Sequence, residues 1–225
     1  MIKAFLMDAR ALTLECAEKI IDATPALAGV ITAKEKSRRL ESAAAYMLLS
    51  FAVRSLGYGA LPRVLRADGG KPYFEDSDIS FSLSHRPGAA LAFISDEGEV
   101  GADIELIKEP DRMAKMAERY LSGIEASAEN APDIDVLVCD VSESGEIKLV
   151  RENADFVNKN LHISRKCAPD TPYLGWTMLE AALKIGGGGF SDYPRVGEII
   201  PTLAAAHYEA KIGDLEYAIT LATRV

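Results

Sequence analysis

Short runs of apolar residues, each ending at turn residues, predict several strands in the first half of the chain. Residues 2–7, 79–85, 89–95 and 100–106 have the length and composition of strands. Only brief turns rich in glycine, proline and acidic residues separate the last three. We therefore expect these three strands to form one antiparallel meander.

Helical spacing of apolar residues predicts four helices. They cover residues 12–21, 32–56, 110–121 and 176–185. Thr32 and Glu35 have the spacing of a capping box, so Thr32 is the expected start of the second helix.

The second half of the chain contains two candidate hairpins. Residues 135–139 and 146–150 flank one turn, and residues 207–212 and 216–222 flank another. Residues 153–172 are polar without a clear period, and we expect a loop there. The order of elements predicts an α+β fold with two similar halves related by a pseudo-twofold, in which antiparallel sheets pack with helices. The predicted halves are residues 1–106 and 107–225.

Composition is typical of a globular protein, and charge narrows the possible partners. The net charge is −9 and the sequence pI is near 5.0, which disfavours nucleic-acid binding. No apolar run approaches the roughly 20 residues of a membrane helix, so no membrane span is expected. The three cysteines lack Cys-x-x-Cys spacing, which favours a reducing cytoplasm and no structural zinc.

One stretch reverses the overall charge. Residues 28–72 contain eight basic and three acidic residues, a net charge of +5. A solvated helix face explains any one of these basic residues. The group as a whole is also consistent with a site for a small polyanion.

Two acidic residues alternate along the predicted strand at 100–106. Asp103 and Glu105 share a face with Gly101, while the residues between them face the opposite way. Two carboxylates on one face can bind a hard cation. The alternative is a partly exposed edge strand with solvated acids.

A second charged pair lies on the predicted helix at 176–185. Glu180 and Lys184 are four residues apart and therefore share one face. One alternative is a surface ion pair worth about 0.3–0.5 kcal/mol. Another is a capping box formed by Thr177 and Glu180. For His85, which shares a strand face with apolar residues, a core histidine is the alternative to a ligand-binding role.

Four motifs in order give these residues a common context. They are Gly70-Lys71-Pro72, F-x-x-S-H at 81–85, G-x-D-x-E at 101–105 and W-T-x-x-E-A-x-x-K at 176–184. In order and spacing they resemble the motifs of the Sfp-type 4′-phosphopantetheinyl transferases. Members of that family transfer the phosphopantetheine arm of coenzyme A to a serine of an acyl or peptidyl carrier protein and release 3′,5′-ADP.

The resemblance implies roles for the charged residues. Asp103, Glu105 and Glu180 match the positions that bind Mg²⁺ in the family. Glu180 is also the implied general base for the carrier serine. Lys184 is implied to neutralise charge on the phosphates of coenzyme A as the P–O bond breaks.

The remaining implied contacts are with coenzyme A. Lys71, Ser84 and His85 match positions that bind its nucleotide and phosphates. The basic helix after Thr32 is similar to the family's early basic helix, which adds Arg38 and Arg39 as candidate contacts.

The chain departs from the family pattern at three places. Ser82 stands where the family usually has Asn, and Arg86 stands where a small polar residue is usual. An apparent insertion around residues 130–172 lies in a region that helps relatives to receive the carrier. We expect the insertion to influence partner specificity.

The resemblance leaves two other function classes open. One is a non-catalytic module that binds coenzyme A or a carrier protein. The other is a metal-dependent phosphohydrolase. A carrier from fatty-acid, polyketide or nonribosomal peptide synthesis is the expected partner, and an acidic carrier would need a local basic or apolar dock. A monomer is the expected oligomeric state.

Overall fold

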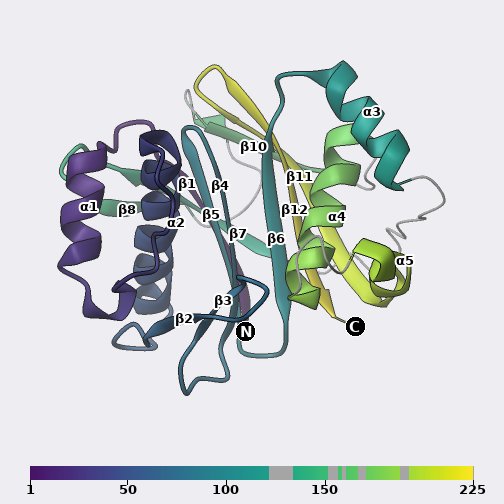
Figure 1. The fold of residues 1–225 in the computed structure, drawn as a ribbon. Coiled ribbons are helices and arrows are strands. Elements are labelled where there is room, and N and C mark those ends of the chain that lie inside the picture. The colour runs from purple at the N-terminus through teal and green to yellow at the C-terminus, as the bar shows by residue number, and fades with distance from the viewer. Residues whose placement is uncertain (122–133, 152–156, 159–160, 167–170, 188–192, 225) are drawn as a thin grey trace.

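The computed structural model describes residues 1–121, 134–151, 157–158, 161–166, 171–187 and 193–224. Two five-stranded sheets lie in the middle of the molecule, and helices cover them on both outer sides (Figure 1). The described chain is therefore a mixed α+β fold arranged as helices, sheet, sheet and helices.

The first sheet takes its strands from residues 2–95 and 135–151. Its order is β4 (Ser80–Arg86), β5 (Ala89–Ser95), β1 (Ile2–Asp8), β7 (Asp135–Val141) and β8 (Ile147–Arg151). All neighbours are antiparallel except β1 and β7, which are parallel. Helices α1 (Leu14–Asp22) and α2 (Lys36–Ser55) lie on its outer side (Figure 1).

The second sheet is entirely antiparallel. Its order is β6 (Val100–Leu106), β12 (Leu215–Arg224), β11 (Leu203–Ile212), β10 (Leu161–Lys166) and β9 (Val157–Asn158). Helices α3 (Pro110–Leu121), α4 (Pro172–Gly186) and α5 (Val196–Ile199) lie on its outer side (Figure 1). A separate two-stranded ribbon joins β2 (Val64–Arg66) to β3 (Pro72–Phe74), and short 3₁₀ turns cover Pro25–Leu27 and Ile200–Thr202.

Three apolar layers hold this arrangement together. The central layer joins the two sheets and includes Leu6, Phe93 and Ile219, all almost completely buried. The outer layers pack α1 and α2 on the first sheet and α3, α4 and α5 on the second. Because both faces of the strands are covered, a strand such as β5 is buried along its whole length.

The predicted meander is wrong in its third strand. β4 and β5 pair as expected, but β6 pairs with β12 in the other sheet. The turn at 96–99 therefore carries the chain from one sheet to the other. Local sequence gives the strand but not its partner, because pairing depends on residues more than 100 positions away.

Two further expectations need correction. Helix α2 begins at Lys36, and the side chain of Glu35, not Thr32, accepts hydrogen bonds from the first-turn N–H groups of Ser37 and Arg38. The predicted loop at 153–172 contains β9 and β10 among its described residues, because β10 pairs with β11. The hairpins 135–150 and 207–222 are confirmed as β7–β8 and β11–β12.

The division into similar halves at residue 106 stays a prediction. Each five-stranded sheet includes strands from both sides of that position, since β6 lies in the second sheet and β7 and β8 in the first. Among the described helices, none is both long enough and apolar enough to span a membrane.

Candidate active site

The candidate site begins with an unusually close approach between α4 and β6. A Cβ atom on Gly101 would lie 2.0 Å from the backbone oxygen of Ala181. No other residue type fits there without moving the helix. On the neighbouring strand β12, Ala218 and Ala222 belong to the same layer and also occupy little space. These small residues bring the second half of α4 onto the acidic residues of β6.

Asp103 lies at the centre of this contact. Its side chain is 2% exposed, and its Oδ1 accepts hydrogen bonds from the Lys184 ammonium (2.7 Å) and the Ser84 hydroxyl (2.8 Å). Lys184 also donates to the backbone oxygen of Ala102 at 2.8 Å. Lys184 therefore links α4 to β6, and its ion pair is neither exposed nor confined to its own helix. Asp103 Oδ2 is buried without a hydrogen-bond partner among the described residues.

Three alternate serines of β4, in the first sheet, form hydrogen bonds with the backbone of β6. The hydroxyls of Ser80, Ser82 and Ser84 accept hydrogen bonds from the backbone N–H groups of β6, at 3.3 Å, 2.9 Å and 3.3 Å. These hydroxyls satisfy N–H groups on the free edge of β6. Serine at every second position of β4 was the sequence signal for this contact, but it has no meaning until β6 is known to lie opposite.

Glu105 is held by an arginine from the same first sheet. Arg86 Nε donates to Glu105 Oε2 at 2.6 Å, and a second guanidinium nitrogen of Arg86 contacts Oε1. Burial alone would lower the pKa of Arg86, but the hydrogen bonds to Glu105 and the charges of Asp103 and Glu180 raise it above its ordinary value. The arginine that departs from the family pattern is therefore part of the site.

Glu180 brings the third carboxylate to the site from α4. Burial, followed by the negative charges of Asp103 and Glu105, raises its pKa to about 7, against the opposing charges of Lys184 and Arg86. The capping-box alternative is wrong, because the cap of α4 is Thr171. Thr177 lies inside the helix and is buried.

Thr177 joins a buried chain of hydrogen bonds next to the carboxylates. Its hydroxyl donates to the backbone oxygen of Leu174 at 3.0 Å and lies 2.7 Å from the hydroxyl of Thr220. Thr220 pairs with Asp103 across β6 and β12 and lies 2.9 Å from Nδ1 of the buried His207. Sequence reasoning missed Thr220 and His207, which carry no motif of their own.

One cavity brings three of the predicted segments together. It has a volume of about 250 Å³ and lies between the Gly-Lys-Pro turn, β4 and α4. Lys71, Ser82, Glu180 and Lys184 are among its lining residues. Burial lowers the pKa of Lys71, although the charge of Glu99 partly opposes this effect.

Other predicted contacts lie on different surfaces. His85 is on the α2 side of β4, where Nδ1 lies 3.3 Å from a carboxylate oxygen of Glu41, while the neighbouring Ser84 faces β6. Arg39 forms an ion pair with Glu18 of α1, and Arg38 is exposed on the first turn of α2. These three residues do not line the cavity that contains Lys71 and Glu180.

Comparison with known proteins places this geometry in context. Proteins named 4′-phosphopantetheinyl transferase AcpT from Salmonella typhi and Salmonella typhimurium are 34% identical to the chain over 94 residues, which is 41% of this chain and 46% of each relative. The protein of that name from Escherichia coli O157:H7 is 43% identical over 49 residues, or 21% of this chain and 25% of the relative. This chain is related to the 4′-phosphopantetheinyl transferases.

The similarity to the phosphopantetheinyl transferases covers only part of each protein. The chain matches less than half the length of these curated relatives. No model of a protein family matches it. The predicted resemblance to the phosphopantetheinyl transferases is confirmed.

The three carboxylates have the type of ligand atom that a divalent cation prefers. Asp103, Glu105 and Glu180 offer only oxygen ligands, and Asp103 Oδ2 is buried without a partner among the described residues. Burial is the main cause of the raised pKa of Glu180, and the negative charge of Asp103 adds to it. In the described parts of the chain, no three acidic, histidine or cysteine side chains are gathered closely enough to form a metal site. A cation would therefore require these side chains to rearrange.

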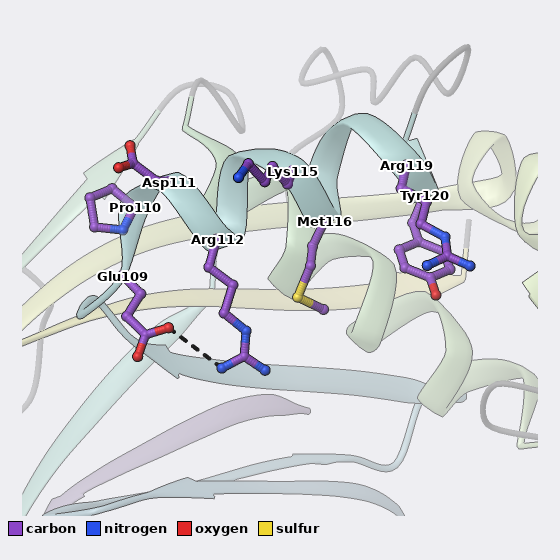
Figure 2. A pocket seen from close by; sticks show the side chains of 8 residues that line it. All are labelled: Glu109, Pro110, Asp111, Arg112, Lys115, Met116, Arg119 and Tyr120. Carbon is purple, nitrogen blue, oxygen red and sulfur yellow. Dashed lines mark hydrogen bonds and ion pairs between the residues drawn. The ribbon is translucent and has the colours of Figure 1, made fainter.

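A larger cavity lies along α3 and is separate from Asp103, Glu105 and Glu180. Its volume is about 770 Å³, and none of the predicted site residues lines it. Figure 2 shows Arg112, Lys115 and Arg119 projecting from α3 beside the apolar Met116. Arg112 forms an exposed ion pair with Glu109 at 3.5 Å (Figure 2). The lining thus combines basic and apolar side chains of α3 with the acidic Glu109 and Asp111 near its start.

Proposed function

We propose that this chain transfers the 4′-phosphopantetheine arm of coenzyme A to a serine of an acyl or peptidyl carrier protein. The observation that carries the proposal is the cavity shared by Lys71, Glu180 and Lys184, which come from two of the four motifs. Phosphoryl transfer needs positioned cations and a base near the transferred group. The partial relationship to named phosphopantetheinyl transferases supports the same activity.

Glu180 is the proposed general base. The carrier serine loses its proton to Glu180 as its oxygen bonds to the β-phosphorus of coenzyme A, and the P–O bond to 3′,5′-ADP breaks. A carboxylate with a pKa of about 7 suits this role at neutral pH, where it is partly ionised and still basic.

The basic residues are proposed to bind the phosphates of coenzyme A. Lys71 and Lys184 lie on the cavity wall with Glu180, and Lys184 is held in place by Asp103. At about 250 Å³ the cavity is smaller than a typical cofactor pocket of roughly 300–1,000 Å³, so it would take only the phosphate-bearing part. Ser84 is proposed to act through Asp103. His85, Arg38 and Arg39 stay proposed contacts of the nucleotide, outside this cavity.

Asp103, Glu105 and Glu180 are the proposed ligands of Mg²⁺. A bound Mg²⁺ would neutralise charge on the pyrophosphate of coenzyme A. The unpartnered Oδ2 of Asp103 is the ligand atom most ready to receive it.

The carrier protein is proposed to dock along α3. Carrier proteins that are acidic would meet Lys115 and Arg119 there, next to the apolar Met116. We expect Lys115→Glu to raise the KM for the carrier while the KM for coenzyme A stays unchanged. Lys19→Glu, at an exposed position of α1 on the outer side of the first sheet, is the matched control. Equal carrier KM values in both variants would reject this docking surface.

Intact-protein mass spectrometry tests the proposed activity. An apo carrier protein is incubated with the full chain, coenzyme A and Mg²⁺, and should gain the mass of one phosphopantetheine arm. Glu180→Gln should reduce this transfer by at least about 100-fold, in the range for loss of a general base. Glu198→Gln, an exposed change on α5, is the control and should leave transfer intact.

The same experiment separates the two other function classes. Cleavage of coenzyme A without a carrier would indicate a phosphohydrolase. Binding of coenzyme A without cleavage or transfer, across fatty-acid, polyketide and peptide carriers, would indicate a non-catalytic binding module.

A further inference from the structure

Arg86 forms an ion pair with Glu105 through two nitrogens of its guanidinium. The Nε–Oε2 distance is 2.6 Å, and the second nitrogen contacts Oε1. The third nitrogen donates to the backbone oxygen of His85 at 3.0 Å. The Glu105 side chain is only 12% exposed, and Arg86 is 34% exposed. Paired charge-assisted hydrogen bonds of this kind are strong and directional.

The backbone that carries Arg86 is fixed to both sheets. The Tyr217 hydroxyl donates to the backbone oxygen of Pro87 at 2.6 Å, and the backbone N–H of Ala9 donates to the backbone oxygen of Gly88 at 3.0 Å. Gly88 has φ 80°, and a Cβ there would lie 3.0 Å from the Arg10 side chain. Arg86 is therefore held at the junction of the sheets instead of extending freely from a surface turn.

Basic side chains already satisfy most of the carboxylate oxygens on β6. Arg86 occupies both oxygens of Glu105, and Lys184 with Ser84 occupies Oδ1 of Asp103. Only Oδ2 of Asp103 lacks a partner among the described residues. A cation that used Glu105 as a ligand would have to take an oxygen from Arg86.

We propose that Arg86 is a built-in competitor that sets how tightly Glu105 can bind a divalent cation. The inference rests on the proposed function, because that function supplies the reason for a cation at Glu105. The guanidinium and the metal cannot use the same carboxylate oxygens together. Removing the guanidinium should therefore strengthen metal binding, although it removes a native ion pair.

Mn²⁺ binding to the full chain tests this competition without any transfer reaction. Free Mn²⁺ is measured by electron paramagnetic resonance, with neither coenzyme A nor carrier present. Arg86→Gln should bind Mn²⁺ about tenfold more tightly than the parent, the scale expected when a hydrogen-bonded charged competitor is removed. Arg10→Gln is the matched control, because Arg10 makes a similar two-nitrogen contact with Asp8 at 2.9 and 2.7 Å. It should leave Mn²⁺ affinity unchanged.

Two more variants assign the effect and allow for misfolding. In a Glu105→Gln background, Arg86→Gln should give no gain, because the contested carboxylate is gone. Arg86→Lys keeps the charge but loses the two-nitrogen contact, and should bind Mn²⁺ between the parent and Arg86→Gln. If Arg86→Gln fails to unfold cooperatively, Arg86→Lys carries the comparison alone.

The outcomes distinguish this inference from the proposed function. Unchanged or weaker Mn²⁺ binding by the folded Arg86 variants overturns the inference, as does a lack of Mn²⁺ binding by every variant. A tenfold gain in a protein that transfers nothing to carriers would support the competition and reject the transferase. Transfer activity with no gain in Mn²⁺ affinity would support the transferase and overturn the competition.

Discussion

Helices α2 and α4 each lie on the outer side of one of the two sheets, but they bury very different side chains. On the first sheet, α2 packs residues such as Ala45, Leu48 and Leu49 against an apolar strand face. On the second sheet, α4 also packs apolar residues, including Leu179, but sets Glu180 and Lys184 against the acids of β6. Both helices are long, and both cover the outer side of a five-stranded sheet (Figure 1).

The difference shows that the architecture itself does not require buried charge. Burying a carboxylate costs free energy unless partners compensate it, and even a compensated pair is often no better than apolar packing. Asp103 is 2% exposed, and one of its oxygens has no partner among the described residues. The α4 interface thus carries a cost that the α2 interface avoids, which is the physical reason to seek chemistry there.

The largest expected effect is on the apolar interface. Leu48→Ala in α2 removes a completely buried side chain and should lower the free energy of unfolding by about 3–4 kcal/mol, through lost transfer energy and a residual cavity. Urea denaturation measures the loss. Transfer per folded molecule should stay at the parental value, because no candidate site residue is touched. A large loss of transfer in the folded variant would mean that the two interfaces are not separable.

A smaller loss of stability is expected where α4 meets β6, but with a loss of activity. Gly101→Ala places a Cβ 2.0 Å from the backbone oxygen of Ala181, so α4 must shift, at a cost of about 2 kcal/mol. Because Glu180 and Lys184 move with the helix, transfer per folded molecule should also fall. Denaturation and the carrier mass assay, run on the same sample, measure both changes.

Gly197→Ala is the matched control for that substitution. Nothing lies within 4 Å of the added Cβ, and the position does not require positive φ. Its stability and transfer should equal those of the parent. If Gly101→Ala behaves in the same way as this control, the close approach of α4 does not position the site.

Sequence reasoning was most successful where local pattern decides structure. Alternation along β6 correctly put Asp103 with Gly101 on the face opposite Ala102 and Ile104, which lie in the layer between the sheets. The helix carrying Glu180 was also predicted, although it begins at Pro172. These features depend on residues within a few positions of each other, which a single sequence contains.

Long-range pairing is what the sequence could not provide. The predicted meander is wrong because β6 pairs with β12 in the second sheet. The hydrogen bond from Ser84 to Asp103 forms only because β6 then lies opposite β4. Arg86 was noted as a departure from the family pattern, but its two-nitrogen contact with Glu105 depends on two sheets meeting at one edge. Such contacts are set by the packing of distant elements and have no local signature.

The smallest expected effect is a dependence of stability on pH that Glu180 confers on the α4 interface. Burial, followed by the charges of Asp103 and Glu105, raises the pKa of Glu180 from 4.5 to about 7. The folded state therefore binds a proton more tightly than the unfolded state does. The stabilisation that comes from protonated Glu180 is complete below pH 4.5 and is lost as the pH rises through 7.

Urea denaturation between pH 5 and 8, with a chelator present, measures this contribution. The parent should lose on the order of 1–2 kcal/mol of unfolding free energy relative to Glu180→Gln across that range, which is less than the full pKa difference implies because the carboxyl is partly solvated. Glu180→Gln removes the titrating group and keeps its shape, so the slope assigned to Glu180 should disappear. Leu48→Ala should keep the parental slope at lower stability, because it removes an apolar side chain and leaves Glu180 in place. Parallel pH profiles for the parent and Glu180→Gln would mean that the charges at the α4 interface are already balanced.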